Sequence, residues 1–316
     1  MSILVTGGAG FIGSHFIERL LATGDEPVVC LDNFDAFYDP ARKRANVASF
    51  AAGDLFRLVE CDICDTDQVR RALAEHEVRA VVHLAAHAGV RRSVEEPGPY
   101  ARVNVSGTLS LLEAARQHRL ERFVLVSSST VYGRGAAVPF VEDAPLGLPM
   151  SPYGATKRAA ELLGLTYLDL HQVPVVVLRP FSIYGPRLRP DLALSIFADA
   201  ILSGRALPLF GDGSIRRDFT HVSDFCAAVC RAIEAQQAIG EAINVGHHDP
   251  IAMSRLIELL AESLGREANI ERLPEKPGDM PVTWADLTKA RRLLDYDPQV
   301  PFADGVREFA EWFKAQ

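Results

Sequence analysis

The sequence has few cysteines and no long hydrophobic run. Its five cysteines among 316 residues are an odd number at low density, which excludes a disulfide framework and favours a reducing compartment. No stretch of 18 apolar residues occurs, and the first apolar residues, 3–6, end at glycines with no basic segment before them. We therefore expect neither a membrane partner nor an export signal, and predict a cytoplasmic location.

An excess of basic charge is also absent. Lysine and arginine number 33 and aspartate and glutamate 41, so the net charge is −8. This balance argues against a nucleic acid as the partner. The 48% hydrophobic and 23% charged content is ordinary for a globular protein and excludes disordered, collagen-like and coiled-coil chains. An anionic ligand would have to be held by a few local positive groups.

A metal site is not predicted. Cys61 and Cys64 have the C-x-x-C spacing, but a zinc site needs a second ligand pair and no second C-x-x-C exists. Cys226 and Cys230 lie four residues apart in an apolar stretch, as packing on one helix face requires. We interpret these cysteines as core thiols.

Strand-like and helix-like segments alternate in the first half of the chain. Short apolar runs predict strands at 3–6, 28–31, 57–61, 80–85, 123–127 and 175–178, each buried on both faces. Helical periodicity occurs at 13–22, 66–75, 104–118 and 153–171. The alternation predicts an α/β fold with a Rossmann-type, doubly wound parallel sheet.

The second half is richer in proline and glycine. Apolar helices are expected at 192–202, 224–236 and 254–264, among many turns. We predict a cofactor domain at 1–179 and a smaller C-terminal α/β substrate-binding region at 180–316, some of whose elements return to the first domain.

A glycine-rich loop follows the first predicted strand. Gly7, Gly10 and Gly13 precede a helix, so a pyrophosphate can approach the backbone and the helix N-terminus. Asp32 ends the second strand, where its carboxylate can accept the adenosine ribose hydroxyls and repel a 2′-phosphate. The pattern predicts NAD rather than NADP as cofactor. A surface turn with three glycines is the alternative explanation.

Two further strand ends suit the same ligand. Asp62 and Ile63 close the third strand, where the adenine is expected and Asp62 can accept from its amine. Leu84, Ala85 and Ala86 close the fourth strand with side chains small enough to admit a dinucleotide. Ordinary strand packing is the alternative for both sets.

Tyr153 and Lys157 stand four residues apart, so in a helix they share one face. An ammonium beside a phenol lowers the phenol pKa, and a nicotinamide cation lowers it further, which makes Tyr153 a candidate general base. Hydroxyl residues that can bind the reacting oxygen follow the fifth strand: Ser127, Ser128, Ser129 and Thr130. Such a Tyr/Lys pair alone is common on surface helices, but its order with the other motifs favours catalysis.

Together the motifs resemble the extended short-chain dehydrogenase/reductases, a family of NAD-dependent epimerases and dehydratases of nucleotide sugars. The resemblance covers essentially the whole chain. It rests on residues 6–13, 83–86, 104–108 and 127–133, on Tyr153 with Lys157, and on Arg217-Asp218-Phe219 and Pro277-Gly278-Asp279.

The resemblance implies roles for the matching positions. Expected to be catalytic are Tyr153, Lys157, Ser128 and Thr130. Expected to bind cofactor are Gly7, Gly10, Phe11, Ile12, Gly13, Asp32, Asn33, Asp62, Ile63, Leu84, Ala85, Ala86, Asn104, Ser127, Tyr153 and Lys157. Expected to bind a UDP-sugar substrate are Arg91, Ser128, Ser129, Thr130, Ser182, Arg189, Arg217 and Asp279.

The serine strand distinguishes the reactions of this family. Dehydratases and UDP-glucuronate decarboxylases resemble one another in carrying an acid there, whereas this chain has Ser129 and Thr130. The resemblance therefore implies a 4-epimerase. In such an enzyme Tyr153 removes the C4 hydroxyl proton while hydride passes to NAD, the 4-keto sugar rotates, and hydride returns to the other face. Asp32 argues against an NADPH-dependent reductase.

Two loops resemble those of UDP-glucuronate 4-epimerases: residues 33–40 and 182–191. By that resemblance Ser182 and Arg189 face the sugar carboxylate. Oxidation at C4 of a glucuronate gives a β-keto acid that can lose carbon dioxide, and donors that fix the carboxylate in the ring plane oppose this loss. A surface position or a phosphate contact is the alternative for Arg189.

Other functions stay open at this point. A UDP-glucose/UDP-galactose 4-epimerase is the main alternative, although such enzymes usually carry an arginine where this chain has Lys276. A UDP-glucuronate decarboxylase and a non-catalytic NAD-binding sensor are further alternatives, the latter disfavoured by the intact Tyr153 and Lys157. The family resemblance also implies a homodimer formed through the helices at 100–118 and 153–171.

Overall fold

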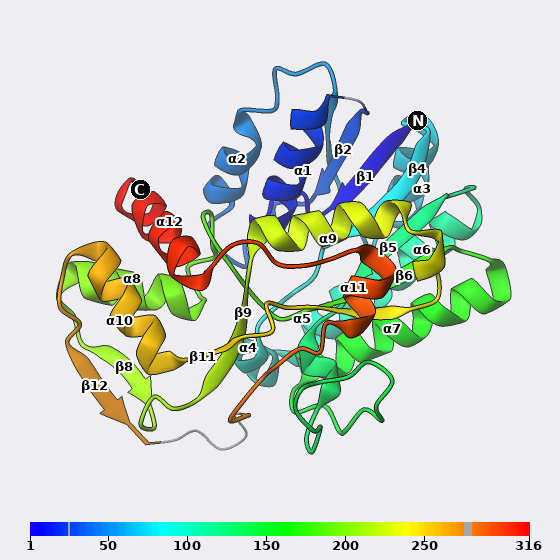
Figure 1. The fold of residues 1–316 in the computed structure, drawn as a ribbon. Helices are drawn as coiled ribbons and strands as arrows, with labels where there is room; N and C mark the ends of the chain where they lie inside the picture. The colour runs from blue at the N-terminus through cyan, green and yellow to red at the C-terminus, as the bar shows by residue number, and fades with distance from the viewer. Residues whose placement is uncertain (25, 275–279) are drawn as a thin grey trace.

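A seven-stranded parallel sheet forms the centre of the molecule (Figure 1). The computed structural model describes residues 1–24, 26–274 and 280–316. The strands are ordered β3-β2-β1-β4-β5-β6-β10. Because the order reverses between β1 and β4, the loops that leave these two strands diverge and open a crevice at the carboxyl edge. The bounds are β1 Ser2–Thr6, β2 Val28–Asp32, β3 Phe56–Glu60, β4 Val78–His83, β5 Arg122–Val126, β6 Val175–Pro180 and β10 Ala242–Val245.

Alternate side chains of each central strand enter two separate cores. In β1, Ile3 and Val5 belong to one core and Leu4 to the other. The first core packs on α1 (Phe11–Thr23) and α9 (Val222–Glu234), and the second on α3 (Thr66–Glu75), α6 (Thr108–Arg116) and α7 (Pro152–His171). Burial on both faces is why the central strands read as continuous apolar runs. The predicted doubly wound fold is confirmed.

Helix α7 begins where its sequence carries two start signals. Ser151 is the N-cap and its hydroxyl accepts from the Gly154 N–H at 3.1 Å, while Pro152 occupies the first helical position. The cap fixes where the first turn starts. It therefore also fixes which residues of the helix face the sheet.

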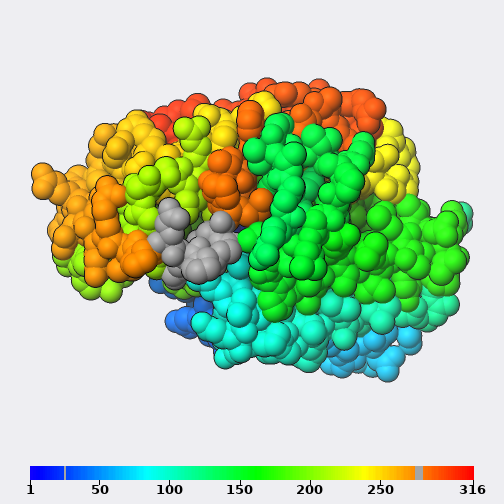
Figure 2. All heavy atoms as spheres, turned by 90° about the horizontal axis from the view of Figure 1, so that it is seen from below, coloured from blue at the N-terminus to red at the C-terminus, as the bar shows by residue number. Residues whose placement is uncertain are grey.

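A second group of elements lies beside the sheet (left in Figure 1) and consists of α8, α10, α12, β8 and β12. A three-stranded sheet, β11-β9-β7, connects it to the centre. Seen from below, green and cyan segments of the first half fill the centre and lower right of the view, and yellow-green to orange segments fill the left (Figure 2). The bounds are α8 Ala193–Ser203, α10 Met253–Leu264, α12 Phe302–Lys314, β7 Ser182–Tyr184, β8 Leu207–Phe210, β9 Arg216–His221, β11 Pro250–Ala252 and β12 Ile270–Leu273.

The six predicted strands all form, with ends within two residues of those expected. One expectation is wrong, because β3 lies at the sheet edge and Arg57, Leu58 and Glu60 are exposed. The sequence did not reveal α2 (Pro40–Ala48), α11 (Thr288–Leu294), α12 or β10, which pairs with β6 in the central sheet. No described helix combines the length and apolarity needed to span a bilayer.

The expected helix at 104–118 is divided in the structure. Short helices α4 (Val90–Glu95) and α5 (Pro97–Tyr100) lead into a π-helical segment, η1 (Ala101–Gly107), and only then into α6. A wider helical turn of this kind changes which side chains share a face. The segment contributes Arg102 and Asn104 to the surroundings of the crevice.

A buried ion pair holds α7 against the sheet. Arg179 of β6 donates to both carboxylate oxygens of Glu161 on α7, at 3.0 and 2.9 Å, and the two side chains are 6% and 5% exposed. Arg179 also donates to the Tyr132 hydroxyl at 3.2 Å, and Tyr132 donates to Asn244 of β10 at 2.7 Å. The network thus joins two strands and a helix, and removing one charge would leave the other buried without a partner.

We predict that Arg179→Met lowers the free energy of unfolding by about 3–5 kcal/mol, because Glu161 then stays buried and unpaired. Urea denaturation measures the change. Arg255→Met, which breaks the exposed pair with Glu258, is the control and should cost less than about 1 kcal/mol. Equal effects of the two substitutions would contradict the role given to the buried pair.

Candidate active site

A cavity of about 830 Å³ opens at the carboxyl edge of the sheet. It is lined by the loops that follow β1, β2, β4 and β5, by the start of α7, and by residues of the second group of elements. Of the predicted site residues that the structure describes, all line it except Asn104. The cavity therefore gathers residues that are far apart in the sequence.

The glycine loop forms a cradle with no room for side chains. A Cβ on Gly13 would lie 2.4 Å from the Gly7 carbonyl oxygen, and one on Gly7, whose φ is +66°, would lie 2.8 Å from Ala85. Gly10 is the N-cap of α1 and has no side-chain hydrogen bond there, so the first N–H groups of the helix stay available to an anion. The cradle suits a pyrophosphate against the backbone.

Asp32 is fixed at the end of β2. Its two carboxylate oxygens accept from the Ala9 N–H at 3.1 Å and the Phe34 N–H at 2.8 Å, and the side chain is buried. The Lys43 ammonium lies 3.8 Å away and is also buried. Each oxygen retains a lone pair, so the carboxylate can still accept from ribose hydroxyls.

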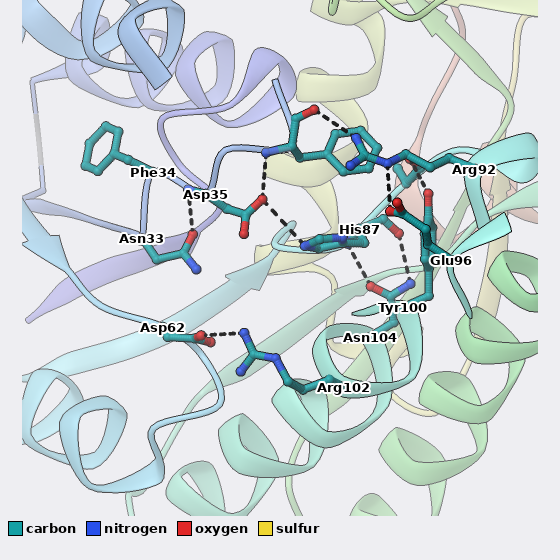
Figure 3. Close-up of polar contacts among 12 residues, drawn as sticks. Asn33, Phe34, Asp35, Asp62, His87, Arg92, Glu96, Tyr100, Arg102 and Asn104 are labelled. Atoms are coloured by element: carbon teal, nitrogen blue, oxygen red, sulfur yellow. Dashed lines mark hydrogen bonds and ion pairs between the residues drawn. The ribbon is translucent and has the colours of Figure 1, made fainter. Parts of the chain in front are cut away.

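Asp62 is held by two donors on the other side of the cavity. Its oxygens accept from the Cys64 N–H at 2.9 Å and from Arg102 at 2.8 Å (Figure 3). Partial burial raises the pKa of Asp62, but these hydrogen bonds outweigh it and leave the pKa below its usual range. The carboxylate is therefore ionised and oriented where an adenine amine is expected.

The hydroxyl residues after β5 differ in their environments. The Ser127 hydroxyl is buried and has no hydrogen-bond partner among the described residues. The Ser128 oxygen accepts from the Thr130 N–H at 3.2 Å and from the Thr130 hydroxyl at 2.9 Å. Thr130 therefore orients Ser128. The unpartnered Ser127 hydroxyl and the glycine cradle both fit a bound dinucleotide.

Tyr153 and Lys157 project from the first two turns of α7 into the cavity. Burial lowers the pKa of Lys157 to about 8, against the opposing charge of Glu161, and its Nζ donates to the Val126 carbonyl at 2.7 Å. Burial raises the pKa of Tyr153, while a hydrogen bond with Ser128 and the charge of Arg189 act in the opposite direction.

The sequence predicts that the neighbouring ammonium lowers the pKa of Tyr153, whereas in the structure this pKa is raised. Within the described chain the desolvation of the phenolate outweighs the groups that stabilise it, so the net shift is upward. The positive charge of Arg189, a residue predicted to bind the substrate, lowers the pKa of Tyr153. A further cation beside the phenol would act in the same direction as this arginine.

Two of the predicted arginines make other contacts at the cavity wall. Arg91 lies over the Phe210 ring at 5.2 Å from its centroid. Arg217 donates from Nη1 to the carbonyls of Arg216 and Met280, at 2.9 and 2.7 Å. Both side chains line the cavity while making these contacts.

Arg189 is held closer to Tyr153. It donates from Nε and Nη2 to the two oxygens of Asp191, at 2.9 and 2.7 Å, and its side chain is 15% exposed. Ser182 stands at the start of β7 and also lines the cavity. The surface alternative for Arg189 is therefore wrong.

Asn104 does not line the cavity, contrary to the prediction. It is buried, accepts from the His87 N–H at 2.8 Å, and donates to the His87 carbonyl at 2.9 Å and to Thr156 at 3.1 Å (Figure 3). It thus ties the loop after β4 to α7. The predicted roles of Lys276 and Asp279 fall outside the described residues.

Lys43 and Arg102 contribute charges that the sequence interpretation did not assign. Lys43 lies on α2, which was not predicted although Asp39 and Pro40 give a start signal, with the Asp39 side chain accepting from the Ala41 N–H. Arg102 lies in the π-helical segment, which has no such signal. Near it, Cys61 and Cys64 are free thiols, and burial raises the pKa of each to about 11.

The fold and the cavity define a class of enzyme. A parallel Rossmann-type sheet, a glycine cradle, an aspartate after β2 and a Ser/Tyr/Lys set at the carboxyl edge together form a short-chain dehydrogenase/reductase.

The comparisons with known proteins identify the family. A family profile described as GDP-mannose 4,6 dehydratase matches residues 4–309, and the chain belongs to this family. A UDP-glucuronate 4-epimerase of Thermodesulfobacterium geofontis is 37% identical over 313 residues, or 98% of this chain and 95% of that protein.

Two solved structures show the same likeness across the whole chain. UDP-glucuronic acid 4-epimerase from Bacillus cereus, in complex with UDP-glucuronic acid and NAD, has a TM-score of 0.94 at 37% identity and covers 100% of this chain and 99% of its own. A dTDP-glucose 4,6-dehydratase from Streptomyces venezuelae with NAD bound has a TM-score of 0.92 at 33% identity and covers 100% and 98%.

We predict that Gly13→Ala raises the Kd for NAD by more than about tenfold. The new methyl would lie 2.4 Å from the Gly7 carbonyl oxygen. A loss of only ~1.4 kcal/mol of binding free energy raises a Kd tenfold. Isothermal titration calorimetry measures the affinity. Gly98→Ala, where a Cβ meets nothing within 4 Å, is the control. An unchanged Kd in the Gly13 variant would contradict the cradle.

Proposed function

We propose that this enzyme is an isomerase that interconverts UDP-glucuronate and UDP-galacturonate at C4, with NAD as a recycled cofactor. The observation that carries the proposal is the Arg189 guanidinium, which lines the same cavity as Tyr153 and whose charge acts on it. A sugar carboxylate is a natural ligand for a guanidinium at this place. The UDP-glucuronate 4-epimerases among the relatives and solved structures support the substrate.

The cofactor is held by residues at the ends of β1, β2, β3 and β5 and on α7. The glycine cradle and the start of α1 receive the pyrophosphate, Asp32 the adenosine ribose, and Asp62 the adenine amine. Lys157 and the unpartnered Ser127 hydroxyl are left for the nicotinamide half. When bound, NAD supplies a hydride acceptor at C4 of the sugar and returns the same hydride.

Tyr153 moves the proton in this mechanism. Its phenolate accepts the proton of the C4 hydroxyl while Ser128, oriented by Thr130, donates a hydrogen bond to the same oxygen. After the 4-keto sugar has rotated in the cavity, Tyr153 returns the proton to the C4 oxygen. The proton and the hydride that leave the sugar both return to it, so the net reaction inverts the configuration at C4.

The carboxylate needs control because the intermediate is a β-keto acid. If the C5–C6 bond breaks, carbon dioxide leaves and the electron pair moves onto the C4 oxygen as an enolate, which then takes a proton at C5. Arg189 and Ser182 both line the cavity, and in the proposed mechanism they hold the carboxylate in one plane and oppose this alignment. Ser129 and Thr130 provide no carboxylic acid for an elimination at the same place.

We propose that residues 1–179 form the cofactor domain and 180–316 the nucleotide-sugar region. Arg189 and Arg217 come from the second region and the cofactor cradle from the first. With Arg91 they supply the local positive charge that a nucleotide-sugar anion requires in a chain of net charge −8.

The reaction is tested by incubating the protein separately with UDP-glucuronate and UDP-glucose and following the products by NMR. We expect UDP-galacturonate from the first. Tyr153→Phe should lower kcat by roughly 10³-fold with an unchanged Kd for NAD, because only the proton transfer is lost. Tyr167→Phe on the same helix is the control.

Three outcomes would contradict this proposal. Turnover of UDP-glucose alone would make the enzyme a UDP-galactose-type epimerase. A UDP-pentose as main product would make it a decarboxylase. Loss of NAD binding in Tyr153→Phe would make the tyrosine a structural residue.

We also propose a homodimer formed through α6 and α7. Leu162 and Leu170 of α7 are 61% and 65% exposed, and Leu109 of α6 is 37% exposed, so these helices present apolar side chains that a partner copy would cover. The family resemblance implies the same interface and supports this proposal.

We predict that Leu162→Glu converts the dimer into a monomer, because a charge would be buried in the apolar contact. Light scattering coupled to size-exclusion chromatography measures the mass. Leu148→Glu, at a residue that is 77% exposed outside these helices, is the control and should leave the dimer intact. A wild-type monomer would contradict the interface.

A further inference from the structure

Phe37 belongs to the loop that follows β2 on the cofactor side, yet its ring lies against the arginine of the substrate side. The Arg189 guanidinium carbon is 5.2 Å from the centroid of the Phe37 ring, and the Arg92 guanidinium carbon is 4.4 Å from it. Stacking of this kind fixes the plane of an arginine more than it adds affinity.

The position of Phe37 is itself determined by the surrounding network. The Phe37 N–H donates to Asp35 at 2.8 Å, and its carbonyl accepts from Arg92 at 3.1 Å. Arg92 also pairs with Glu96 at 3.2 Å (Figure 3). His87 contacts the edge of the ring with centroids 5.2 Å apart, and its Nε2 is 3.6 Å from Asp35. These contacts therefore hold the Phe37 ring in one position.

Asp191 and Ala88 fix the remaining edge of Arg189. Asp191 accepts from Nε and Nη2 with both oxygens, and the Ala88 carbonyl accepts from Nη2 at 3.4 Å. Among the described residues Nη1 has no hydrogen-bond partner, so its two N–H groups are the ones left for a ligand. Asp191 also neutralises the charge of the Arg189 guanidinium. A ligand carboxylate therefore binds mainly through directed hydrogen bonds and less through net electrostatic attraction.

We propose that Phe37 and Asp191 are positioning residues that hold Arg189 in one orientation and thereby select a substrate carboxylate and keep it from decarboxylation. The inference rests on the proposed function. A guanidinium free to turn would let the carboxylate leave the ring plane, because an arginine side chain has several soft torsions. The loop after β2 thus serves both the cofactor and the substrate arginine.

The binding test uses NAD-loaded protein with Tyr153→Phe, so that the sugar is not converted. Phe37→Leu and Asp191→Asn are each added, and calorimetry measures the Kd for UDP-glucuronate and for UDP. We expect the first Kd to rise about tenfold and the second to stay within about twofold. Phe37→Tyr, which retains the aromatic face, should restore most of the affinity. Asp297→Asn, in the exposed pair with Arg291, is the control.

The product test uses the active enzyme and UDP-glucuronate. With Phe37→Leu or Asp191→Asn, the share of UDP-pentose among the products should rise at least several-fold over wild type, and Phe37→Tyr should reverse most of the rise. Unchanged Kd and product share, or an equal loss of UDP affinity, would overturn the inference while leaving the proposed function standing. A wild type that binds UDP-glucuronate through Arg189 but does not convert it would overturn the proposed reaction and leave the positioning role standing.

Discussion

The buried pair between Arg179 and Glu161 is the interaction on which the reactive geometry depends. It fastens α7 to β6 from inside the molecule, one helical turn beyond Lys157. Lys157 in turn donates to the end of β5, so the helix that carries Tyr153 is tied to two neighbouring strands. Two charges without water hold one orientation, because any other would leave them unpaired. The position of Tyr153 follows from this constraint.

Desolvation sets the electrostatics of the cavity. It lowers the pKa of Lys157 and raises that of Tyr153, so the protein by itself keeps both groups closer to neutral than in water. The charged groups of the cavity are of both signs: arginines and Lys43, and carboxylates such as Asp32 and Asp62. A chain with a net charge of −8 can therefore bind two anions, because helix α1 and a few guanidinium groups act over short distances in a poorly solvated space.

The loop after β2 links the two halves of the site. Asp32 at its start faces the cofactor side, whereas Phe37 near its end stacks on Arg189. A parallel sheet makes such sharing common, because every strand delivers its following loop to the same edge. Arg189 is in this way supported by the segment that begins at Asp32.

The first six strands in their order, the glycine cradle, Asp32 and the Tyr/Lys pair could be predicted from the sequence, because they depend on local periodicity and on backbone conformation. The remaining features depend on how distant segments pack. Asn104 matched a family motif, yet its side chain ties His87, a residue of the cavity lining, to Thr156 of α7. Lys43, Arg102 and Phe37 gained their contacts from a helix, a π-helical turn and a loop that have weak local signals. Contacts between distant segments depend on how the layers pack, which no short stretch of sequence encodes.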